Sequence, residues 1–424
     1  MALTVSVDEI VHGSRNSLLD VRPHWKRIRL REIASVLNGG AFKSTQFTKG
    51  DGVPLIRIRD VGSDSTDTNY VGEFDERYIV EPGDLLIGMD GDFNCARWRG
   101  PRGLLNQRVC KVTLQGDQYH PRFLDFALPG YLKAINDATS SVTVKHLSSR
   151  TVEDIPLPFP SLHEQDEIVA ELEKQFSRLD EAVANLKRVK AKLKRYKAAV
   201  LADAVEGELA GESTEWRSVR LGDIATSVRN GISTKPVGES GPRILRISAV
   251  RPMTLDLNDV RYLAQPHDEF DSFRLAAGDV LFTRYNGSVD LVGVCAVVPE
   301  LLERTVYPDK LIRVRVPSEV LLPSFLVIAA STGEARAFIG SRIRTTAGQA
   351  GVSGADIKAI PLHVPPLQEQ HRIVAEVDRR LSVVREVEAE VDANLQRAQA
   401  LRQAVLAKAF ADKPSDPPRE GARA

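Results

Sequence analysis

The sequence contains nearly the same helix start twice. Residues 160–173 read PSLHEQDEIVAELE, and residues 365–378, which begin 205 positions later, read PPLQEQHRIVAEVD. A repeat with such a long period indicates that the chain is built from two similar structural units. Any fold for the chain therefore has to contain two copies of one architecture.

Further segments of the two halves match in the same order. The matched pairs are WKRIRLREIA at 25–34 with WRSVRLGDIA at 216–225, LIRI at 55–58 with ILRI at 244–247, PGDLLI at 82–87 with AGDVLF at 277–282, PRFL at 121–124 with PSFL at 323–326, and DIPL at 154–157 with the end of KAIPL at 358–362. The offset drifts from 191 at residue 25 to 205 before residue 160 and then stays constant. The first part of each half therefore tolerates insertions, as loop-rich β structure does, whereas the second part tolerates none.

The second part of each half is predicted to be one long helix. Neither glycine nor proline occurs from 161 to 206 or from 367 to 413. Apolar residues recur every seven positions along a seam of Leu172, Leu179, Leu186, Leu193 and Val200 in the first helix and Val377, Val384, Val391, Ala398 and Val405 in the second. Ala182, Val189 and Tyr196 are expected on the same side. Five heptads with charged flanks predict a coiled coil, and the great length disfavours the alternative of two helices each lying on its own globular head.

If the helices pair with each other, the short link at 207–215 makes an antiparallel arrangement the simplest one. About 40 helical residues at about 1.5 Å each make a rod of about 60 Å with one head at each end. Two similar heads at a fixed distance suit a two-fold ligand such as duplex DNA, of which ~60 Å spans roughly 18 base pairs.

The heads are predicted to be mixed β. Short β-branched runs are bounded by Gly, Pro, Asp and Asn, and they are Val53–Arg59, Asp84–Ile87, Arg108–Leu114, Gly278–Phe282 and Leu311–Val316. A short helix is expected after Pro121 and after Pro323. The predicted fold class is thus α+β, with two mixed α/β heads separated by an antiparallel coiled coil in a pseudo-two-fold repeat.

The expected domains follow from these patterns. They are an N-terminal segment at 1–24, head one at 25–155, a long spacer helix at 156–206, head two at 207–360, a second spacer helix at 361–411, and a polar tail at 412–424 that is expected to be disordered. The N-terminal segment is predicted to pack near the end of the second helix.

Overall charge does not indicate nucleic-acid binding. The chain has 57 basic and 57 acidic residues and a formal net charge of zero, so any DNA contact must depend on local basic surface or on a partner. The densest basic run is Lys187, Arg188, Lys190, Lys192, Lys194, Arg195 and Lys197. It is interpreted either as a contact to DNA or a partner, or as a solvated face, part of which pairs with acidic Glu386, Glu388, Glu390 and Asp392 of the second helix.

The compartment is expected to be the cytoplasm. No run of 18 or more apolar residues occurs, and the first 20 residues lack the pattern of a secretory signal. The scattered cysteines 95, 110 and 295 fit a reducing compartment and are interpreted as core residues rather than metal ligands.

The combination of motifs closely resembles the specificity subunit of type I restriction–modification enzymes. The resemblance is carried by the W-x-x-x-x-L-x-x-I-A openings, the internal G-D-[LV]-[LI] strands and the E-Q-x-x-I-V helix starts, and it spans residues 25 to about 410. It implies that each head is a target recognition domain that reads one half of an asymmetric gapped DNA sequence. It also implies that the coiled coil spaces the heads and docks two modification subunits, which bind S-adenosylmethionine and methylate adenine, while ATP-dependent restriction subunits join to cleave.

The chain itself is expected to be neither an enzyme nor a metal protein. It has no G-x-x-x-x-G-K-[ST] loop, and Asp416-Pro-Pro-Arg419 lacks the aromatic residue of a methyltransferase loop. His163-Glu164 lacks the second histidine of a zinc motif. Asp84 and Asp279 each follow a glycine before a strand and are interpreted as turn residues rather than catalytic acids.

Candidate base-reading residues are loop side chains that can donate to base edges. In head one they are Lys43, Ser44, Thr45, Gln46, Asn94, Arg97, Gln107, Arg108, Ser141, Thr143 and Lys145, and in head two they are Arg229, Asn230, Lys235, Arg284, Asn286, Arg342, Arg344, Thr345 and Gln349. Each of them is alternatively an ordinary solvated residue. The segments SSVTVKHLSS at 140–149 and TTAGQAGVSG at 345–354 occupy matching positions but differ in polar content, as two different specificities would require.

Two other functions compete with DNA recognition. The neutral net charge is compatible with a non-catalytic coiled-coil scaffold whose heads bind proteins. A self-contained methyltransferase or nuclease would need motifs that the sequence does not contain.

Overall fold

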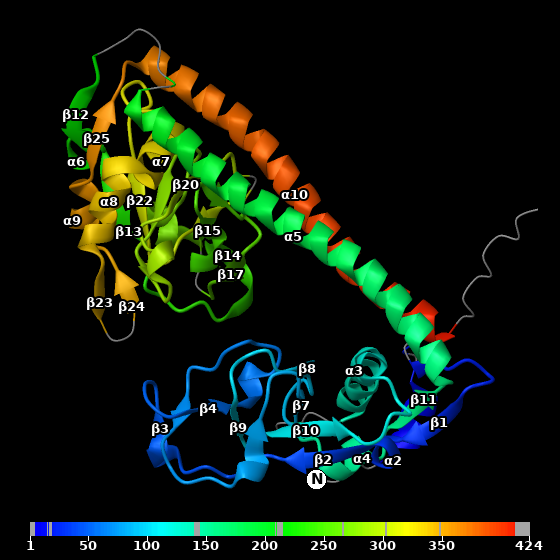
Figure 1. Ribbon diagram of the computed structural model, residues 1–424. Coiled ribbons are helices and arrows are strands. Elements are labelled where there is room, and N and C mark those ends of the chain that lie inside the picture. The colour runs from blue at the N-terminus through cyan, green and yellow to red at the C-terminus, as the bar shows by residue number, and fades with distance from the viewer. Residues whose placement is uncertain are drawn as a thin grey trace, which may run out of the picture. The chain divides into compact units, whose positions relative to one another are not determined.

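The computed structural model describes residues 5–14, 16, 19–139, 145–207, 209, 215–264, 267–301, 303–346 and 349–411. The chain divides into two compact units, one of Met1–Asn185 with Asn394–Ala424 and one of Leu186–Ala393. Each unit contains one head together with part of both long helices, α5 (Leu162–Glu206) and α10 (Leu367–Ala411), which are the green and the orange-to-red helices of Figure 1.

Head one combines small sheets with short helices. Its strands form the pair β1 (Lys26–Arg29) and β11 (Pro156–Phe159), the four-stranded order β2 (Ala34–Asn38), β10 (Val109–Leu114), β7 (Leu85–Gly88), β8 (Cys95–Arg97), and the five-stranded order β3 (Phe47–Thr48), β5 (Asn69–Tyr70), β4 (Val53–Ile56), β9 (Gly103–Leu105), β6 (Ile79–Val80). Its unit also holds α1 (Val7–Gly13), α2 (Leu30–Ile33), α3 (Pro121–Ala138) and α4 (Ser149–Glu153).

Head two repeats this frame with additions. Its strands form the pair β12 (Arg217–Arg220) and β25 (Pro361–Val364), the four-stranded order β13 (Ser227–Asn230), β22 (Leu311–Arg315), β18 (Val280–Thr283), β20 (Cys295–Val297), and the smaller sets β17 (Val260–Tyr262), β14 (Gly238–Leu245), β21 (Thr305–Val306); β15 (Val250–Arg251), β16 (Thr254–Leu255); and β19 (Tyr285–Asn286), β24 (Gln349–Gly351), β23 (Arg344–Thr346). Its helices are α6 (Leu221–Ile224), α7 (Pro323–Ser331), α8 (Gly333–Arg342) and α9 (Gly354–Lys358).

The two heads share the strand order and register of the two-stranded pair and of the four-stranded sheet, so the repeat read from the sequence is a repeat of structure. Lys26 pairs with Phe159 in β1–β11, and Arg217 pairs with Val364 in the matching β12–β25. The helix expected after Pro121 is present but spans 18 residues, and the one after Pro323 spans 9. The β-branched runs also form strands; four of these are shorter than the run, and β7 has the length of its run but begins one residue later.

The starts predicted for the two spacer segments were wrong in one respect. Residues 156–159 and 361–364 are strands that pair with the opening strand of each head, and the helices begin only at Leu162 and Leu367. Proline explains the difference, because Pro158 and Pro160 disfavour helical conformation in the residues that precede them.

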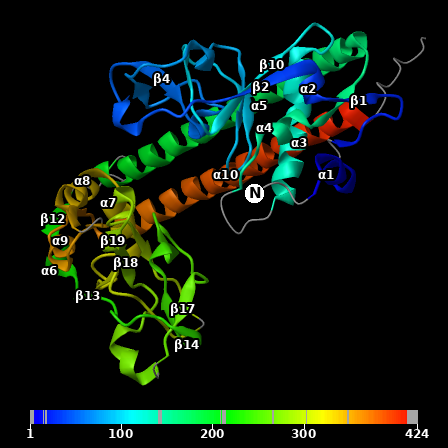
Figure 2. The ribbon, with the colours of Figure 1, turned by 90° about the horizontal axis from the view of Figure 1, so that it is seen from below.

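The long helices run antiparallel within each unit, as predicted. In the first unit Arg402 Nη1 lies 2.7 Å from Asp180 Oδ1, and in the second Lys190 Nζ lies 2.6 Å from Asp392 Oδ1. Ten residues forward in α5 thus correspond to ten residues back in α10. Both views show the two helices side by side (Figures 1 and 2).

Burial along the predicted seam is uneven. Leu172, Val200 and all but the last of the predicted α10 positions are buried, whereas Leu179, Leu186, Leu193 and Val405 are only partly covered. Val189 and Tyr196, expected on the same side, remain 38% and 48% exposed. The reason is geometric, because one partner helix covers one apolar column, and a second column needs a further partner.

The N-terminal segment packs where it was predicted to pack. Val7, Ile10 and Val11 of α1 belong to the same apolar core as Phe410 near the end of α10. Arg22 Nη2 donates to the carbonyl of Ala409 at 2.9 Å, and the rings of Phe123 and Phe410 lie 5.2 Å apart. Among the helices in the described ranges, none is long and apolar enough to cross a membrane.

The repeated Glu-Gln of the helix starts has a structural role. Gln165 is fully buried, its Oε1 accepts from the backbone N–H of His120 at 2.7 Å, and its Nε2 donates to the carbonyls of Pro160 and Gln118. Gln370 is buried as completely and makes the same set of bonds. Each glutamine therefore ties a long helix to the turn before it and to the start of the head's main helix, α3 or α7.

Replacing Gln165 with leucine should destabilise the first unit strongly. The substitution nearly preserves volume but leaves the His120 N–H and two carbonyls without a partner, and each such buried group costs about 1–3 kcal/mol. We expect a loss of about 3 kcal/mol in the free energy of unfolding, measured by urea denaturation. Gln175→Leu on the exposed face of the same helix is the control and should shift stability by less than about 0.5 kcal/mol. Equal effects of the two changes would show that the buried bonds contribute nothing.

Candidate nucleic-acid interface

In each head, β2 or β13 leaves the four-stranded sheet through an Asn-Gly pair. Gly39 N–H donates to the Val109 carbonyl at 2.9 Å, and Gly231 N–H donates to the Leu311 carbonyl at 3.2 Å. A Cβ atom would lie 2.1 Å from the Asn106 oxygen at Gly39 and 2.2 Å from the Tyr307 oxygen at Gly231. Only glycine allows this close approach, so the position at which the loop leaves the sheet is the same in both heads.

A second loop joins the same end of each sheet. In head one, Met89 N–H donates to the Arg108 carbonyl at 3.0 Å, and Leu147 N–H donates to the Met89 carbonyl at 2.7 Å. In head two, Arg284 N–H donates to the Lys310 carbonyl at 2.8 Å, and Val352 N–H donates to the Arg284 carbonyl at 2.9 Å. The backbone bridge between Asp90 and His146 likewise matches the pairing of Tyr285 with Gly351.

We call these places the loop ends, comprising 88–91, 106–109 and 145–147 in head one and 283–286, 308–311 and 349–352 in head two. The described residues 145–147 and 349–352 of the two matched segments lie there on one shared backbone frame. Their side chains differ while their hydrogen bonds agree, so the frame does not depend on loop composition.

The predicted base-reading residues of head one fall into different groups. Gln107 and Arg108 are exposed at the loop end, and Lys145 donates from Nζ to the Asn136 carbonyl at 2.6 Å. Lys43, Ser44 and Thr45 are exposed in the loop after β2, where Oε1 of Gln46 accepts from the Tyr70 hydroxyl at 2.6 Å. Ser141 and Thr143 lie outside the described residues.

Two candidates of head one hold other parts of the fold. Arg97 donates from Nε to Asp125 at 2.7 Å and from its two Nη atoms to the carbonyls of Gly83 and Pro121, so its donors bind the chain itself. Asn94 lies at the start of β8 and donates to the Val61 carbonyl at 3.4 Å. Both are therefore weaker candidates for base contact than Arg108.

Several candidates of head two belong to one small sheet. Asn286, Arg344, Thr345 and Gln349 lie in the sheet β19–β24–β23, and Arg284 directly precedes β19. At the end of β13, Arg229 and Asn230 are exposed, and the Arg229 guanidinium stacks 4.1 Å from the Phe273 ring centre. Lys235 is exposed in the loop that follows, and Arg342 stacks on Phe338 at the end of α8.

Arg342 and Arg344 of head two lie close to the carboxylate of Asp356. Burial alone would raise the pKa of Asp356, but hydrogen bonds from Ser353 and the positive charges of Arg344 and Arg342 outweigh it and lower the pKa. Exposed Lys310 adds another cation. Head two therefore carries cations near its loops although the net charge of the chain is zero.

Two aspartates that could have been catalytic are turn residues, as interpreted from the sequence. Asp84 Oδ2 accepts from the Glu81 N–H and Asp279 Oδ2 from the Ala276 N–H, each at 2.9 Å. Gly83 and Gly278 before them have φ of +97° and +86°, a left-handed conformation that favours glycine.

The cysteines are free, and no cluster of three metal-ligating side chains occurs in the part of the chain that the structure describes. Burial raises the pKa of Cys110 and of Cys295 to about 12, so both stay protonated thiols at neutral pH. This agrees with their interpretation as core residues.

Comparison with known proteins identifies the architecture. The family described as "Type I restriction modification DNA specificity domain" matches residues 23–195. The specificity subunit of the type I restriction enzyme EcoBI from Escherichia coli is 35% identical over 434 residues, which cover 97% of this chain and 90% of the relative. This chain belongs to the family of type I restriction enzyme specificity subunits.

Two further specificity-subunit relatives agree. The EcoKI specificity subunit of Escherichia coli strain K12 is 32% identical over 421 residues, covering 91% of this chain and 88% of the relative. A chain from a solved type I R-M system has a TM-score of 0.68 at 18% identity and covers 92% of this chain and 98% of that one, which shows a shared fold.

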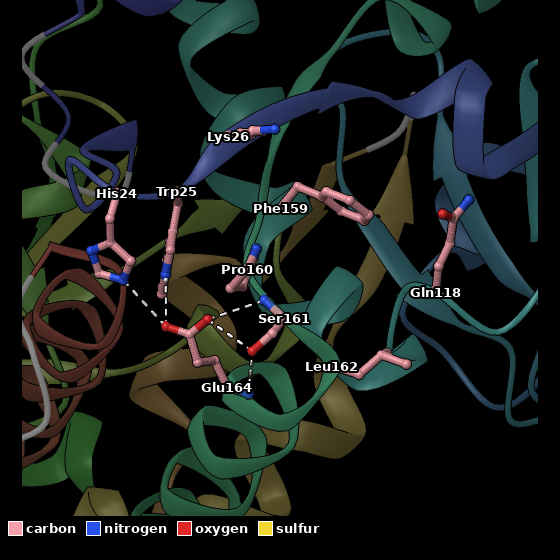
Figure 3. A pocket seen from close by; sticks show the side chains of 9 residues that line it. All are labelled: His24, Trp25, Lys26, Gln118, Phe159, Pro160, Ser161, Leu162 and Glu164. Atoms are coloured by element: carbon pink, nitrogen blue, oxygen red, sulfur yellow. Dashed lines mark hydrogen bonds and ion pairs between the residues drawn. The ribbon is translucent and has the colours of Figure 1, made fainter.

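A hollow of about 410 Å³ lies beside the start of α5 and is lined in part by His24, Trp25 and Glu164 (Figure 3). Glu164 accepts from Trp25 Nε1 and His24 Nε2, each at 3.2 Å, and forms the predicted capping box with Ser161. Burial alone would raise the pKa of Glu164, but these hydrogen bonds outweigh it and lower the pKa to about 2. The group therefore holds the head's opening strand to the helix.

Glu164→Gln should destabilise the first unit in a pH-dependent way. Because the folded-state pKa lies below the ordinary 4.5, ionised Glu164 stabilises the fold above about pH 4.5, and this contribution is lost as the pH falls towards 2. We expect a loss of about 1 kcal/mol at pH 7 that shrinks below pH 4.5, measured as the difference in unfolding free energy from the unsubstituted chain. Glu167→Gln, one turn away, is the control and should show no such trend. A constant difference from pH 7 to pH 3 would contradict the assignment.

Proposed function

We propose that this chain is the DNA sequence-recognition subunit of a type I restriction–modification complex, with each head reading one half of an asymmetric gapped site. Family membership supports the general role. The single observation that supports two half-sites is the pair of loop ends, which share backbone hydrogen bonds but carry different side chains. Two readers on one frame suit one duplex read at two places.

Catalysis in this proposal belongs to other chains. Two modification subunits would bind S-adenosylmethionine and methylate adenine, and restriction subunits would join them for cleavage. The long helices would dock the modification subunits, a role that the exposed apolar side chains Val189 and Tyr196 support, because such residues on a surface column mark contact with a further partner.

Exchanging one head should change one half of the recognised sequence. Residues 25–155 would be replaced by the corresponding head of a relative with another specificity, and the assembled complex would methylate DNA whose modified adenines are then mapped by sequencing. We expect a new sequence in one half of the motif and the old one in the other half. A change in both halves, or in neither, would contradict the two-head proposal. Absence of any sequence preference in the unaltered complex would instead favour the scaffold whose heads bind proteins.

The helix pair should act as a ruler for the gap. Because the pairing is antiparallel, four residues would be inserted at facing positions, between Asn185 and Leu186 in α5 and between Gln396 and Arg397 in α10. Each insertion lengthens its helix by about 6 Å, equivalent to roughly two base pairs of duplex. We expect the mapped gap to grow by about two base pairs. The same four residues inserted in α5 alone break the pairing register and serve as the control, which should lose binding.

A further inference from the structure

Three side chains from separate segments meet at the loop end of head one. Asp90 follows β7, Arg108 precedes β10, and His146 lies in the loop before α4. The Asp90 carboxylate accepts from Arg108 Nη1 at 2.8 Å and from His146 Nδ1 at 2.7 Å. The bridge between the backbones of Asp90 and His146 holds two of the three segments together.

Exposure distinguishes the roles of the three residues. The Asp90 side chain is 18% exposed, whereas those of Arg108 and His146 are 53% and 47% exposed. The carboxylate is therefore a half-hidden acceptor that orients two donors lying at the surface. Since a carboxylate only accepts here, Nδ1 of His146 carries the proton, and Nε2 is left for another partner.

The chemistry of this set suits an acceptor-bearing ligand. One Nη of Arg108 binds Asp90, and the remaining N–H groups of its planar fork are available to donate in pairs. A guanidinium held in one plane fits the N7 and O6 acceptors of guanine in the major groove, the commonest specific contact of arginine with DNA. A phosphate offers oxygen acceptors as well, but it carries no sequence information.

In head two, the same backbone pairing carries different side chains at the positions of these three residues. Its matching positions hold Tyr285, Lys310 and Gly351, and the Arg284 guanidinium lies 4.6 Å from the Tyr285 ring centre. A Cβ at Gly351 would come within 2.2 Å of the Tyr285 ring, so the aromatic side chain occupies the place of the His146 imidazole. An acid with two donors in one head thus corresponds to an aromatic ring in the other.

We propose that Arg108 and His146, oriented by Asp90, form a base-recognition site for the acceptor edge of a purine, guanine foremost, in the half-site read by head one. The proposal rests on the function proposed above and adds the residues and the ligand class. Asp90 is a positioning residue that acts through the other two. Tyr285 occupies the equivalent place for the other half-site.

The test uses the assembled complex with its modification subunits and S-adenosylmethionine. It methylates a library of duplexes randomised in both halves of the motif established for the unaltered complex, and the modified sequences are counted. Arg108→Gln, His146→Gln and Asp90→Asn are compared with Glu81→Gln, which breaks an exposed ion pair with Arg102 elsewhere in head one. We expect discrimination at one or two adjacent positions of one half to fall by on the order of tenfold for Arg108→Gln and Asp90→Asn, and to fall at the same positions for His146→Gln. The other half and the control should be unchanged.

A second measurement separates positioning from mere structural support. If Asp90 acts through its two partners, Asp90→Asn should change the preference no further in a chain that already carries Arg108→Gln and His146→Gln. Further loss of the preference in that background would contradict the positioning role.

Each other outcome bears on the proposal. Equal loss of methylation on all sequences would identify a phosphate contact and overturn the base-recognition site, as would unchanged preferences or changes in both halves. Because His146 is exposed, His146→Gln is expected to fold normally. If Asp90→Asn does not fold, His146→Gln decides the test. An unchanged sequence preference of His146→Gln would then overturn the base-recognition site. If the unaltered complex methylated no two-part motif, this separate result would contradict the proposed function itself.

Discussion

The junction between each head and its long helix depends on one buried side-chain amide. Gln165 and Gln370 each accept from one backbone N–H and donate to two backbone carbonyls, in places that water does not reach. A helix start next to a proline-rich turn leaves polar backbone groups that must find partners, and the glutamine supplies them. Because three chain segments meet there, the direction in which each helix leaves its head is set by the same few bonds.

This junction explains why, within each repeat, the head tolerates insertions and the long helix does not. Downstream of the glutamine, the helices pair in a constant register, with Asp180 against Arg402 and Lys190 against Asp392, so an insertion would misplace every later contact. Upstream, loops leave sheet ends at which the same backbone hydrogen bonds recur in both heads. Side chains there can change without loss of the frame, which is the property that a family of sequence readers needs.

Charged side chains also lie close together within each head. In head two, Arg342 and Arg344 lie close to Asp356, although the net charge of the chain is zero. In head one, the carboxylate of Asp90 offsets part of the charge of Arg108 and orients both Arg108 and His146.

The repeat, the helical period and the antiparallel pairing were all readable from the sequence, because each is a pattern of residue types at fixed spacing. The candidate site was readable only in part. Arg108 and Arg344 were identified from the sequence as donors near turns. The sequence did not show that Arg97 forms hydrogen bonds within the fold, because its partners Asp125, Gly83 and Pro121 come from distant segments. Asp90 and His146 were passed over for the same reason, since 56 residues separate the two side chains and a backbone bridge brings them together.

The strands at 156–159 and 361–364, the exposed column of Val189 and Tyr196, and the glutamine bonds were likewise decided by tertiary contacts. The sequence alone determined that each of two similar heads is followed by a long helix and that the two helices have equal length, since local propensity and periodicity act within one segment. Which side chains stay free to meet a ligand was decided only by the tertiary structure, because a donor's availability depends on what the rest of the fold has already bound.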